Sequence, residues 1–168
     1  MKIKKRFWIP LAILVAGFLI PDPGIIPVAG ASRSDWHADT FWFEPWGSSV
    51  THKGIDIFGN KGTSVIAAGY GIRLFEGTLP KGGKVLIYLG PRWRIHYYAH
   101  VDSFATSPHW LVSPGDKIAT LGDSGNAKGK PPHLHYSLVT LIPYPWRIDQ
   151  STQGWKKSFY LNPVDHFD

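Results

Sequence analysis

The stretch 129-GKPPHLHYSLV-139 places two histidines one residue apart inside an alternating run that is typical of a β-strand. In a strand, side chains two residues apart lie on the same face, about 7 Å from each other, and the side chain between them points to the opposite face. His133 and His135 therefore address one place, whereas Leu134 faces another layer. By itself such a pair fits either a functional site or a polar strand face open to water. The rest of the chain is needed to choose between these two interpretations.

Similar runs rich in Val, Ile, Tyr and Leu recur along the chain, separated by turn signals such as GNKGT, LPKGG and DSGN. Between residues 36 and 168 no segment sustains a helical period of 3.6 residues over three turns. The pattern predicts an all-β fold, a mostly antiparallel sandwich or partly open barrel whose loops carry the chemistry. The strands are expected over residues 64–67, 71–76, 84–89, 94–99, 117–120 and 133–141.

The amino terminus has the pattern of an export signal. The basic stretch MKIKKR precedes an apolar run over residues 7–20, which is shorter than the roughly 20 residues of a standard membrane span. Ala29 and Ala31 form the small-x-small pattern that signal peptidases accept, which predicts cleavage before Ser32. An uncleaved membrane anchor is the alternative. In both cases we expect an exported protein, in the periplasm or elsewhere in the cell envelope, with anchoring to the inner membrane if the segment is not cleaved.

The remaining sequence is long enough for one sizeable core and short for two. We expect a signal or anchor over 1–31, an arm over 32–45 and one domain over 46–168, acting as a monomer. Without residues 1–31, the 14 basic and 11 acidic residues that remain leave a charge of +3 and no Lys/Arg run, so we expect no nucleic-acid partner. The chain has no cysteine and hence no disulfide.

A second histidine cluster lies upstream, in THKGIDIF. His52 and Asp56, together with a further imidazole, would make a three-ligand zinc site with one position left for water. Residues four apart on a regular strand lie about 13 Å from each other, so the backbone must turn between these two ligands. Gly54 permits such a turn.

The third cluster is HYYAH, in which two histidines flank two tyrosines. His100 comes at the end of a predicted strand, just before a loop, a place suited to a catalytic side chain. His96 lies within the strand, and we interpret it as structural or surface. For His37, His109 and His166 we also expect surface or packing roles.

Taken together, H-x-x-x-D, Y-A-H-V, G-D-S-G-N and P-P-H-L-H-Y occur in an order that resembles the lysostaphin/LytM-type zinc metalloendopeptidases, which hydrolyse peptide bonds of bacterial peptidoglycan and have the duplicated hybrid motif fold. The resemblance runs from about Trp46 to Pro163 and includes the connecting segments. It implies that one Zn²⁺ per chain is bound by His52, Asp56 and His135.

The same resemblance implies that His100 and His133 are the catalytic pair beside the metal, so the two histidines of the opening stretch have different tasks. Zinc lowers the pKa of a bound water to about 7. A neighbouring histidine, with an ordinary pKa of about 6.5, can then take a proton from that water and return one to the leaving amine.

One position departs from the family pattern. Members often have a tyrosine about six residues before the first zinc histidine, where it helps to stabilise the tetrahedral intermediate, but here Trp46 stands at that distance. An indole donates a hydrogen bond but cannot exchange a proton as a phenol does. Tyr98 is a candidate substitute, with a packed aromatic as the other interpretation.

Two alternatives to an endopeptidase stay open. Some members of the family lack zinc ligands and act as binding or activating modules for other wall hydrolases, and a zinc carboxypeptidase acting on stem peptides uses similar ligands. A glycosidase would need two positioned carboxylates, and Glu44, Glu76 and Asp102 have no such spacing.

The expected substrate is peptidoglycan, cleaved in its peptide cross-links or stem peptides; a periplasmic location favours cross-links through diaminopimelate. Stiff apolar walls for the substrate groove are expected from the Trp-, Pro- and Tyr-rich loops over 36–50, 101–113 and 142–160. The sequence leaves open whether the 32–45 arm, with His37 and Asp39, covers the zinc.

Overall fold

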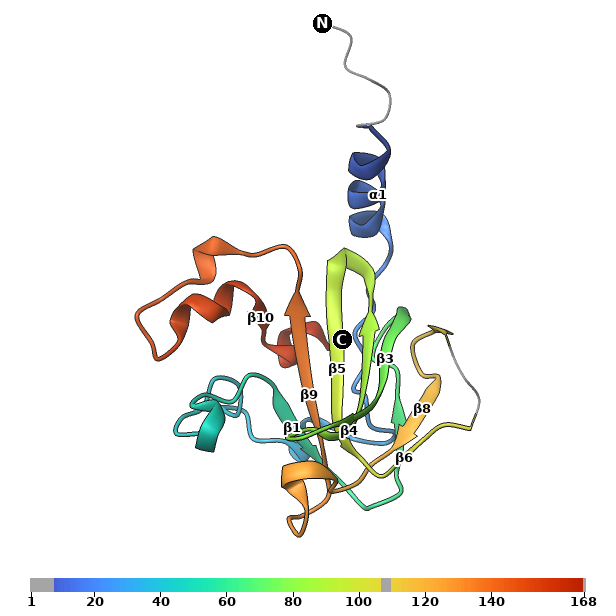
Figure 1. The fold of residues 1–168 in the computed structure, drawn as a ribbon, viewed down its shortest axis with the longest axis vertical. Helices are drawn as coiled ribbons and strands as arrows, with labels where there is room; N and C mark the ends of the chain where they lie inside the picture. Colours follow the sequence, from blue (N-terminus) through green and yellow to red (C-terminus); the bar gives the residue numbers. More distant parts are fainter. Residues whose placement is uncertain (1–7, 107–109, 168) are drawn as a thin grey trace, which may run out of the picture.

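The computed structural model describes residues 8–106 and 110–167. In it, a seven-stranded sheet in the order β1-β9-β5-β4-β3-β7, with β10 beside β9, lies next to a three-stranded sheet in the order β2-β8-β6 (Figure 1). All pairings between these strands are antiparallel. The strands are β1 Ile55–Phe58, β2 Ser64–Ile66, β3 Gly71–Leu79, β4 Gly83–Leu89, β5 Arg94–Val101, β6 Ser103–Phe104, β7 Leu111–Val112, β8 Lys117–Thr120, β9 His133–Thr140 and β10 Tyr160–Leu161.

One α-helix and several short 3₁₀ helices complete the described part of the chain. The helices are α1 Trp8–Leu19, η2 Arg33–Asp35, η3 Gly47–Ser49, η4 Pro91–Trp93, η5 Gly125–Ala127, η6 Pro145–Arg147, η7 Gly154–Ser158 and η8 Pro163–His166. Of the 3₁₀ helices, η4, η5, η6 and η7 lie in connections between strands, η2 and η3 precede β1, and η8 follows β10.

The predicted fold class is confirmed, and the six predicted strands are present as β2, β3, β4, β5, β8 and β9. β3 is longer than predicted and continues to Leu79, and β9 ends at Thr140. The sequence missed β1, β6, β7 and β10. β6, β7 and β10 have two residues each, too few to display an alternating pattern, whereas β1 lies in the segment where the His52-to-Asp56 spacing predicts a turn.

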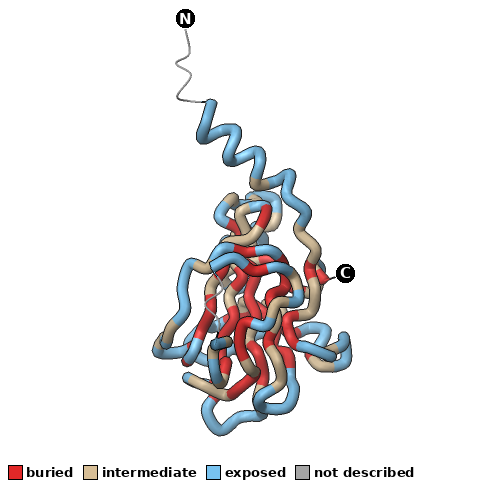
Figure 2. Tube along the Cα trace, turned by 90° about the vertical axis from the view of Figure 1, so that its right-hand side faces the viewer, coloured by how far each residue is buried: buried red, intermediate tan, exposed pale blue. Residues whose placement is uncertain are grey.

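The core lies against one face of β1 and β9. Ile55 and Ile57 of β1 and Leu134 and Tyr136 of β9 have no exposed surface. Because successive strand residues point to opposite faces, the polar residues between them face away from this core. Figure 2 shows the buried central strands and the exposed helix α1 at one end of the molecule.

Helix α1 extends from the body of the molecule and has no buried residue. Within residues 8–106 and 110–167 no helix is long and apolar enough to cross a membrane. The basic stretch before α1 and His109 fall outside the described residues. The division of the chain at residues 31 and 45 stays a prediction.

Candidate metal centre

Strand pairing brings two of the three predicted metal ligands together. β1 and β9 pair so that Asp56 lies directly opposite His135. Both side chains point away from the core because their neighbours Ile55, Ile57 and Leu134 point into it. Residues 79 positions apart in sequence are therefore neighbours on one sheet face, as directly opposed residues of an antiparallel pair must be.

The third predicted ligand, His52, comes from the coil before β1, which must approach β9 closely. A Cβ atom on Gly54 would lie 2.5 Å from the carbonyl oxygen of Tyr136 and 2.6 Å from Ser137 Oγ. Glycine is required at this position because there is no space for a side chain. A left-handed backbone is not the reason, since φ is not positive at this residue. The predicted turn between His52 and Asp56 is present, for a different physical reason.

The three side chains converge, so that one nitrogen or oxygen atom of each lies close to one atom of each of the others. His52 Nε2 lies 3.1 Å from Asp56 Oδ1 and 3.0 Å from His135 Nδ1, and His135 Nδ1 lies 2.8 Å from Asp56 Oδ1. One ligand atom from each residue thus falls within 4.8 Å of the other two. The group is buried except for His135, which is partly exposed.

Hydrogen bonds on the far side of His52 fix its tautomer. His52 Nδ1 lies 2.9 Å from the carbonyl oxygen of Thr40. A carbonyl oxygen only accepts, so Nδ1 carries the proton and donates it to Thr40. In the neutral ring, Nε2 is then left with its lone pair directed at Asp56 and His135.

The tautomer of His135 is fixed in the same manner. Ser137 Oγ donates to the carbonyl oxygen of Lys53 at 2.8 Å, so it accepts from His135 Nε2 at 3.0 Å. His135 Nδ1 therefore has a lone pair too, and two imidazole lone pairs and a carboxylate oxygen point at one another. Three such donor atoms repel each other unless a cation lies between them, which is the arrangement of a His₂Asp zinc site with oriented ligands.

The ionisation states agree with a cation site. Burial lowers the pKa of the His135 ring, which keeps that ring neutral. Burial raises the pKa of Asp56, but hydrogen bonds and charge from His135 and His52 lower it by more when those nitrogens carry protons, and a metal ion in place of the protons would act in the same direction. An ionised carboxylate and a neutral imidazole are the forms that bind a divalent metal.

His100 faces the same site because of an unusual backbone. On β5, Ala99 pairs with His135 and shares its face, so regular alternation would turn His100 toward the core. Its φ is +65°, in the left-handed region, which re-aims the side chain. The ring donates from Nδ1 to the carbonyl oxygen of Ser124 at 2.9 Å, and burial lowers its pKa to about 4. His100 is therefore neutral, with the lone pair of Nε2 available.

His133 lies beside it, with 5.1 Å between the two ring centroids. Its Nδ1 donates to the carbonyl oxygen of Pro131 at 2.8 Å, which leaves Nε2 as the acceptor, 4.0 Å from Asp56 Oδ2. Two proton-accepting nitrogens thus lie next to the three converging donor atoms.

These side chains line one hollow. A cavity of about 530 Å³ is bounded by Asp56, His100, His133 and His135, together with Trp46. A second hollow of about 520 Å³ adjoins it, and His135 and Trp46 line both. The candidate metal group therefore lies between two adjacent depressions.

Trp46 has a supporting role that the sequence did not suggest. Its indole stacks on the ring of His52 with 4.0 Å between centroids and 23° between planes. Tyr98, the candidate substitute for the missing tyrosine, is buried and its hydroxyl accepts from the Ala68 amide at 3.0 Å, away from the site. Tyr97, which lines the second hollow, has its ring 6.3 Å from that of His135.

Of the predicted groove loops, two contribute to these hollows: 36–50 through Trp46 and 142–160 through Gln153 and Lys156. No described residue of 101–113 lines them. Residues of the 32–45 arm, including His37 and Asp39, line a further depression beside Asp56. Among the described residues, neither is part of a group able to hold a metal.

The remaining described histidines lie elsewhere. His96 is 1% exposed and hydrogen-bonded to the Tyr136 hydroxyl at 2.7 Å, and burial lowers its pKa to about 3. It forms a second compact group with Asp22 and His166. There Arg94 Nη1 donates to Asp22 Oδ2 at 2.7 Å, so a cation already neutralises the carboxylate. His96 and His166 are thus structural, in agreement with the packing roles expected for them.

Sequence reasoning missed the residues that orient the five histidine and aspartate side chains. Ser137 could have been found, because it follows His135 by two positions on the same strand face. Thr40 and Ser124 act through backbone carbonyls that are 12 and 24 residues from their histidines, so no local pattern indicates them.

Comparison with known proteins identifies the family to which the sequence is similar. Residues 50–144 match the description of peptidase family M23. The L-Ala–D-Glu endopeptidase of Bacillus subtilis is 32% identical over 124 residues, which cover 63% of this chain and 35% of that protein. The murein hydrolase activator NlpD of Escherichia coli is 31% identical over 105 residues, covering 61% and 27%. The chain therefore spans about a third or less of the length of these curated relatives.

Two solved structures share the fold. LytM from Ruminococcus gnavus superimposes with a TM-score of 0.63 at 22% identity, covering 95% of this chain and 66% of that one. A zinc-containing peptidase from Vibrio cholerae superimposes with a TM-score of 0.57 at 25% identity, covering 71% and 37%. The lysostaphin/LytM-type resemblance read from the motifs is thereby confirmed.

Proposed function

This chain belongs to peptidase family M23, and from that membership we propose that it is a zinc-dependent endopeptidase that hydrolyses peptide bonds of bacterial peptidoglycan. The observation that carries the proposal is the convergence of His52 Nε2, His135 Nδ1 and Asp56 Oδ1, with both imidazole tautomers set to present lone pairs. Such a donor set suits one Zn²⁺ per chain. A bound Zn²⁺ would supply Lewis acidity and lower the pKa of a water in its open position.

The residues around that position perform the proton transfers. His100 and His133 are held by Ser124 and Pro131 so that each Nε2 faces the hollow as an acceptor. We assign one of them as the base that takes a proton from the attacking water. The resulting imidazolium then returns a proton to the leaving amine, and the partner histidine orients the reacting groups.

The charge of the groove fits an acidic peptide. Lys130 lines the first hollow, and Lys53 and Lys156 line the second. Stem peptides of peptidoglycan carry free carboxylates, which ammonium groups at both ends of the groove would attract. The bond cut is a cross-link or a stem-peptide bond, and the site of action is the cell envelope, where we expect a monomer.

The test is digestion of purified peptidoglycan sacculi with mass analysis of the products and measurement of bound zinc. The intact protein is expected to hold about one zinc per chain and to split cross-linked or stem peptides internally. His133→Ala should retain zinc and lose about 100- to 10,000-fold of turnover, the usual contribution of general acid–base catalysis. His135→Ala should lose the metal as well. Release of a single terminal amino acid would identify a carboxypeptidase instead.

A second candidate is an activator of other wall hydrolases, because the NlpD relative bears that description. Activators of this family have lost zinc ligands, whereas here all three are present and converge. Absence of zinc from the purified protein, together with stimulation of another hydrolase and no cleavage of its own, would favour this candidate.

A further inference from the structure

Residues 22–31, here called the linker segment, are part of the folded domain. The Ile25 amide donates to the Ala68 carbonyl at 2.9 Å, the Ile66 amide donates to Pro27 at 3.0 Å, and Ala29 donates to Ser64 at 2.9 Å. Val28 forms an isolated bridge with Val65, and its side chain is 3% exposed within the core. The linker segment therefore covers the edge of β2 and completes the core beneath it.

The start of the linker segment is fixed by an ion pair. Asp22 and Arg94 are 2.7 Å apart, with side chains 1% and 14% exposed. Gly24 lies against the chain near its carboxyl end, since a Cβ there would clash with the carbonyl oxygen of His166. Cleavage before Ser32 would remove the partner of a buried guanidinium and open the core at Val28, so the fold itself argues for retention of residues 1–31.

Retention also keeps α1, whose exposed apolar side chains are unfavourable in water. None of the twelve residues of this helix is buried, and its exposed side chains include Ile9, Ile13 and Phe18. Its orientation relative to the domain is fixed, because Trp93 Nε1 donates to the Leu14 carbonyl at 2.9 Å and Gly17 packs on the same indole ring. A helix that is apolar all round is stable only when something apolar surrounds it.

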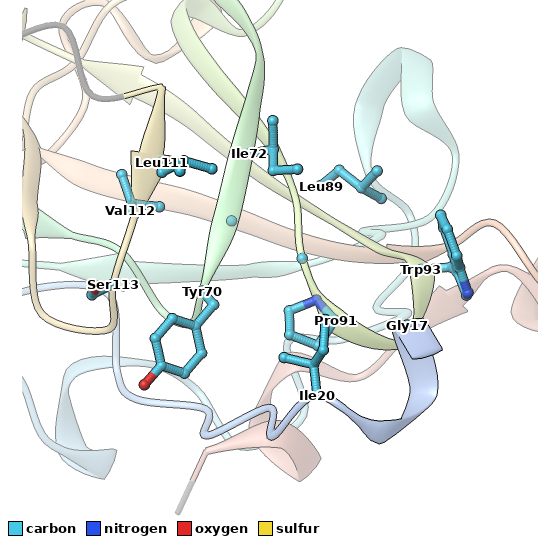
Figure 3. A pocket seen from close by; sticks show the side chains of 12 residues that line it. Gly17, Ile20, Tyr70, Ile72, Leu89, Pro91, Trp93, Leu111, Val112 and Ser113 are labelled. Carbon is cyan, nitrogen blue, oxygen red and sulfur yellow. The ribbon is translucent and has the colours of Figure 1, made fainter. Parts of the chain in front are cut away.

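The apolar surface continues from α1 onto the domain. A groove of about 420 Å³ runs between the end of α1 and strands β3, β4 and β7 (Figure 3). Ile20 and Pro91 lie together on one side of it, and Ile72 and Leu111 lie on the other. Ile72 is 50% exposed and Leu111 70%, and no described segment of the chain covers them.

We propose that α1 and this apolar groove form one membrane-binding surface, which the mature protein keeps because the linker segment belongs to the fold. The occupant is a lipid bilayer with anionic headgroups. Four of the first six residues are basic, namely Lys2, Lys4, Lys5 and Arg6, and exposed Arg92 lies in η4 next to the groove. Basic residues beside an apolar surface, with tryptophan and tyrosine at its rim, are the composition that anionic membrane interfaces attract.

Membrane docking would orient the candidate catalytic site. β5 begins at Arg94, next to η4 and α1, and reaches His100 six residues later, about 20 Å along the strand. α1 extends from the end of the molecule opposite the start of β9 (Figure 1). A bilayer at α1 therefore leaves the hollow at the other end open to the polymer outside. This inference does not depend on catalytic activity, since its tests measure the amino terminus and lipid binding.

The first test is the amino terminus of the full chain, expressed in a bacterium and extracted from the envelope fraction. Intact mass and terminal sequencing should find residues 1–31 still attached in protein that stays with the membrane after a high-salt wash. A mature chain that begins at Ser32 would overturn the proposal.

The second test is flotation of the full chain with vesicles of phosphatidylglycerol and phosphatidylethanolamine, compared with vesicles of phosphatidylcholine alone. Ile72→Ser combined with Leu111→Ser should weaken binding about ten-fold, because two apolar side chains that would contact the lipid are lost. The matched control is Trp146→Ser with Ile148→Ser, two exposed apolar residues in and after η6, which should bind as the unaltered chain does.

Equal binding by the groove variant and the unaltered chain would overturn the role of the groove, as would equal loss in the control. A groove-dependent dimer in solution that binds no vesicles would assign the surface to a second copy instead and would likewise contradict the proposal. Because all four substituted side chains are exposed, thermal unfolding should be unchanged in both variants, which separates lipid binding from folding.

Discussion

The outer contacts of the candidate metal ligands are the most informative feature at the scale of single residues. Thr40 and Ser137 are not among the candidate ligands, yet they decide which nitrogen of His52 and of His135 carries the proton. Such orienting partners usually contribute about 10- to 100-fold to metal affinity.

Ser137→Ala is predicted to weaken zinc binding by about 10- to 100-fold, because His135 Nε2 loses its acceptor and the ring can adopt the wrong tautomer. Competition with a chromogenic zinc chelator measures this affinity. The matched control is Ser103→Ala, an exposed hydroxyl on β6 bonded to Thr120, which should leave affinity unchanged. Equal affinity in all three proteins would contradict the assigned tautomer.

The buried ring of His96 predicts a pH dependence of stability. The folded chain keeps this ring neutral down to its pKa of about 3, whereas the unfolded chain binds a proton below about pH 6.5. The unfolded state therefore holds more protons between these pH values, and the free energy of unfolding falls as pH drops from 6.5 toward 3, by on the order of a few kcal/mol.

Denaturant titrations at several pH values test this. His96→Gln, which keeps a partner for the Tyr136 hydroxyl, should show a smaller loss of unfolding free energy between pH 6.5 and 4 than the unaltered protein. His37→Gln, an exposed position, should follow the unaltered protein. Parallel curves for the His96 variant and the unaltered chain would refute the assignment.

At the scale of elements, the close approach of β1 and β9 holds the site together. Their pairing sets Asp56 opposite His135, and the coil before β1 brings in His52. Six strands could be predicted from their composition and the turn signals that flank them, but β1 could not, although it carries a candidate ligand, because the spacing of His52 and Asp56 predicts a turn in that segment.

Gly54→Ala is predicted to disturb both stability and metal binding, because the added methyl group meets the Tyr136 carbonyl at 2.5 Å and backbone cannot yield as a side chain can. Overpacking of this kind costs about 1–3 kcal/mol, or several degrees in Tm for a chain of this size. Calorimetry and zinc analysis provide the measurement.

The control for this substitution is Gly59→Ala. Its added methyl group would meet only Leu121 at 3.5 Å, an ordinary contact, so Tm and zinc content should stay close to those of the unaltered protein. Equal behaviour of the two variants would show that the approach of β1 to β9 is not limiting.

At the scale of the whole molecule, the metal ion proposed for catalysis should also stabilise the folded state. Three donor atoms that repel one another without a cation should make the metal-free protein less stable. Chelation is predicted to lower the unfolding free energy by about 3 kcal/mol when zinc is otherwise present at about a hundred times its Kd. Added zinc should restore it.

His135→Ala serves as the control for chelation, because a chain that cannot hold the ion has no such stability to lose. Its Tm should be the same with and without chelator. A chelator effect of equal size in this variant would place the stabilising ion somewhere other than at the proposed ligands.

The sequence by itself determined the residue types, their order and the local geometry. Strand alternation in residues 133–139 predicts that both histidines share a face, and the motif order predicts the family. These features depend on neighbouring residues and fixed periods, so they can be read without coordinates.

Only the tertiary structure decided how distant groups meet. The left-handed φ of His100, the tautomer of His52 set by Thr40, the hydrogen bond from Ser137 to Lys53, and the packing of the linker segment at Val28 all depend on contacts between residues far apart in the chain. No local period encodes such contacts, because they arise from how complete strands pack and which backbone groups that packing leaves to be hydrogen-bonded.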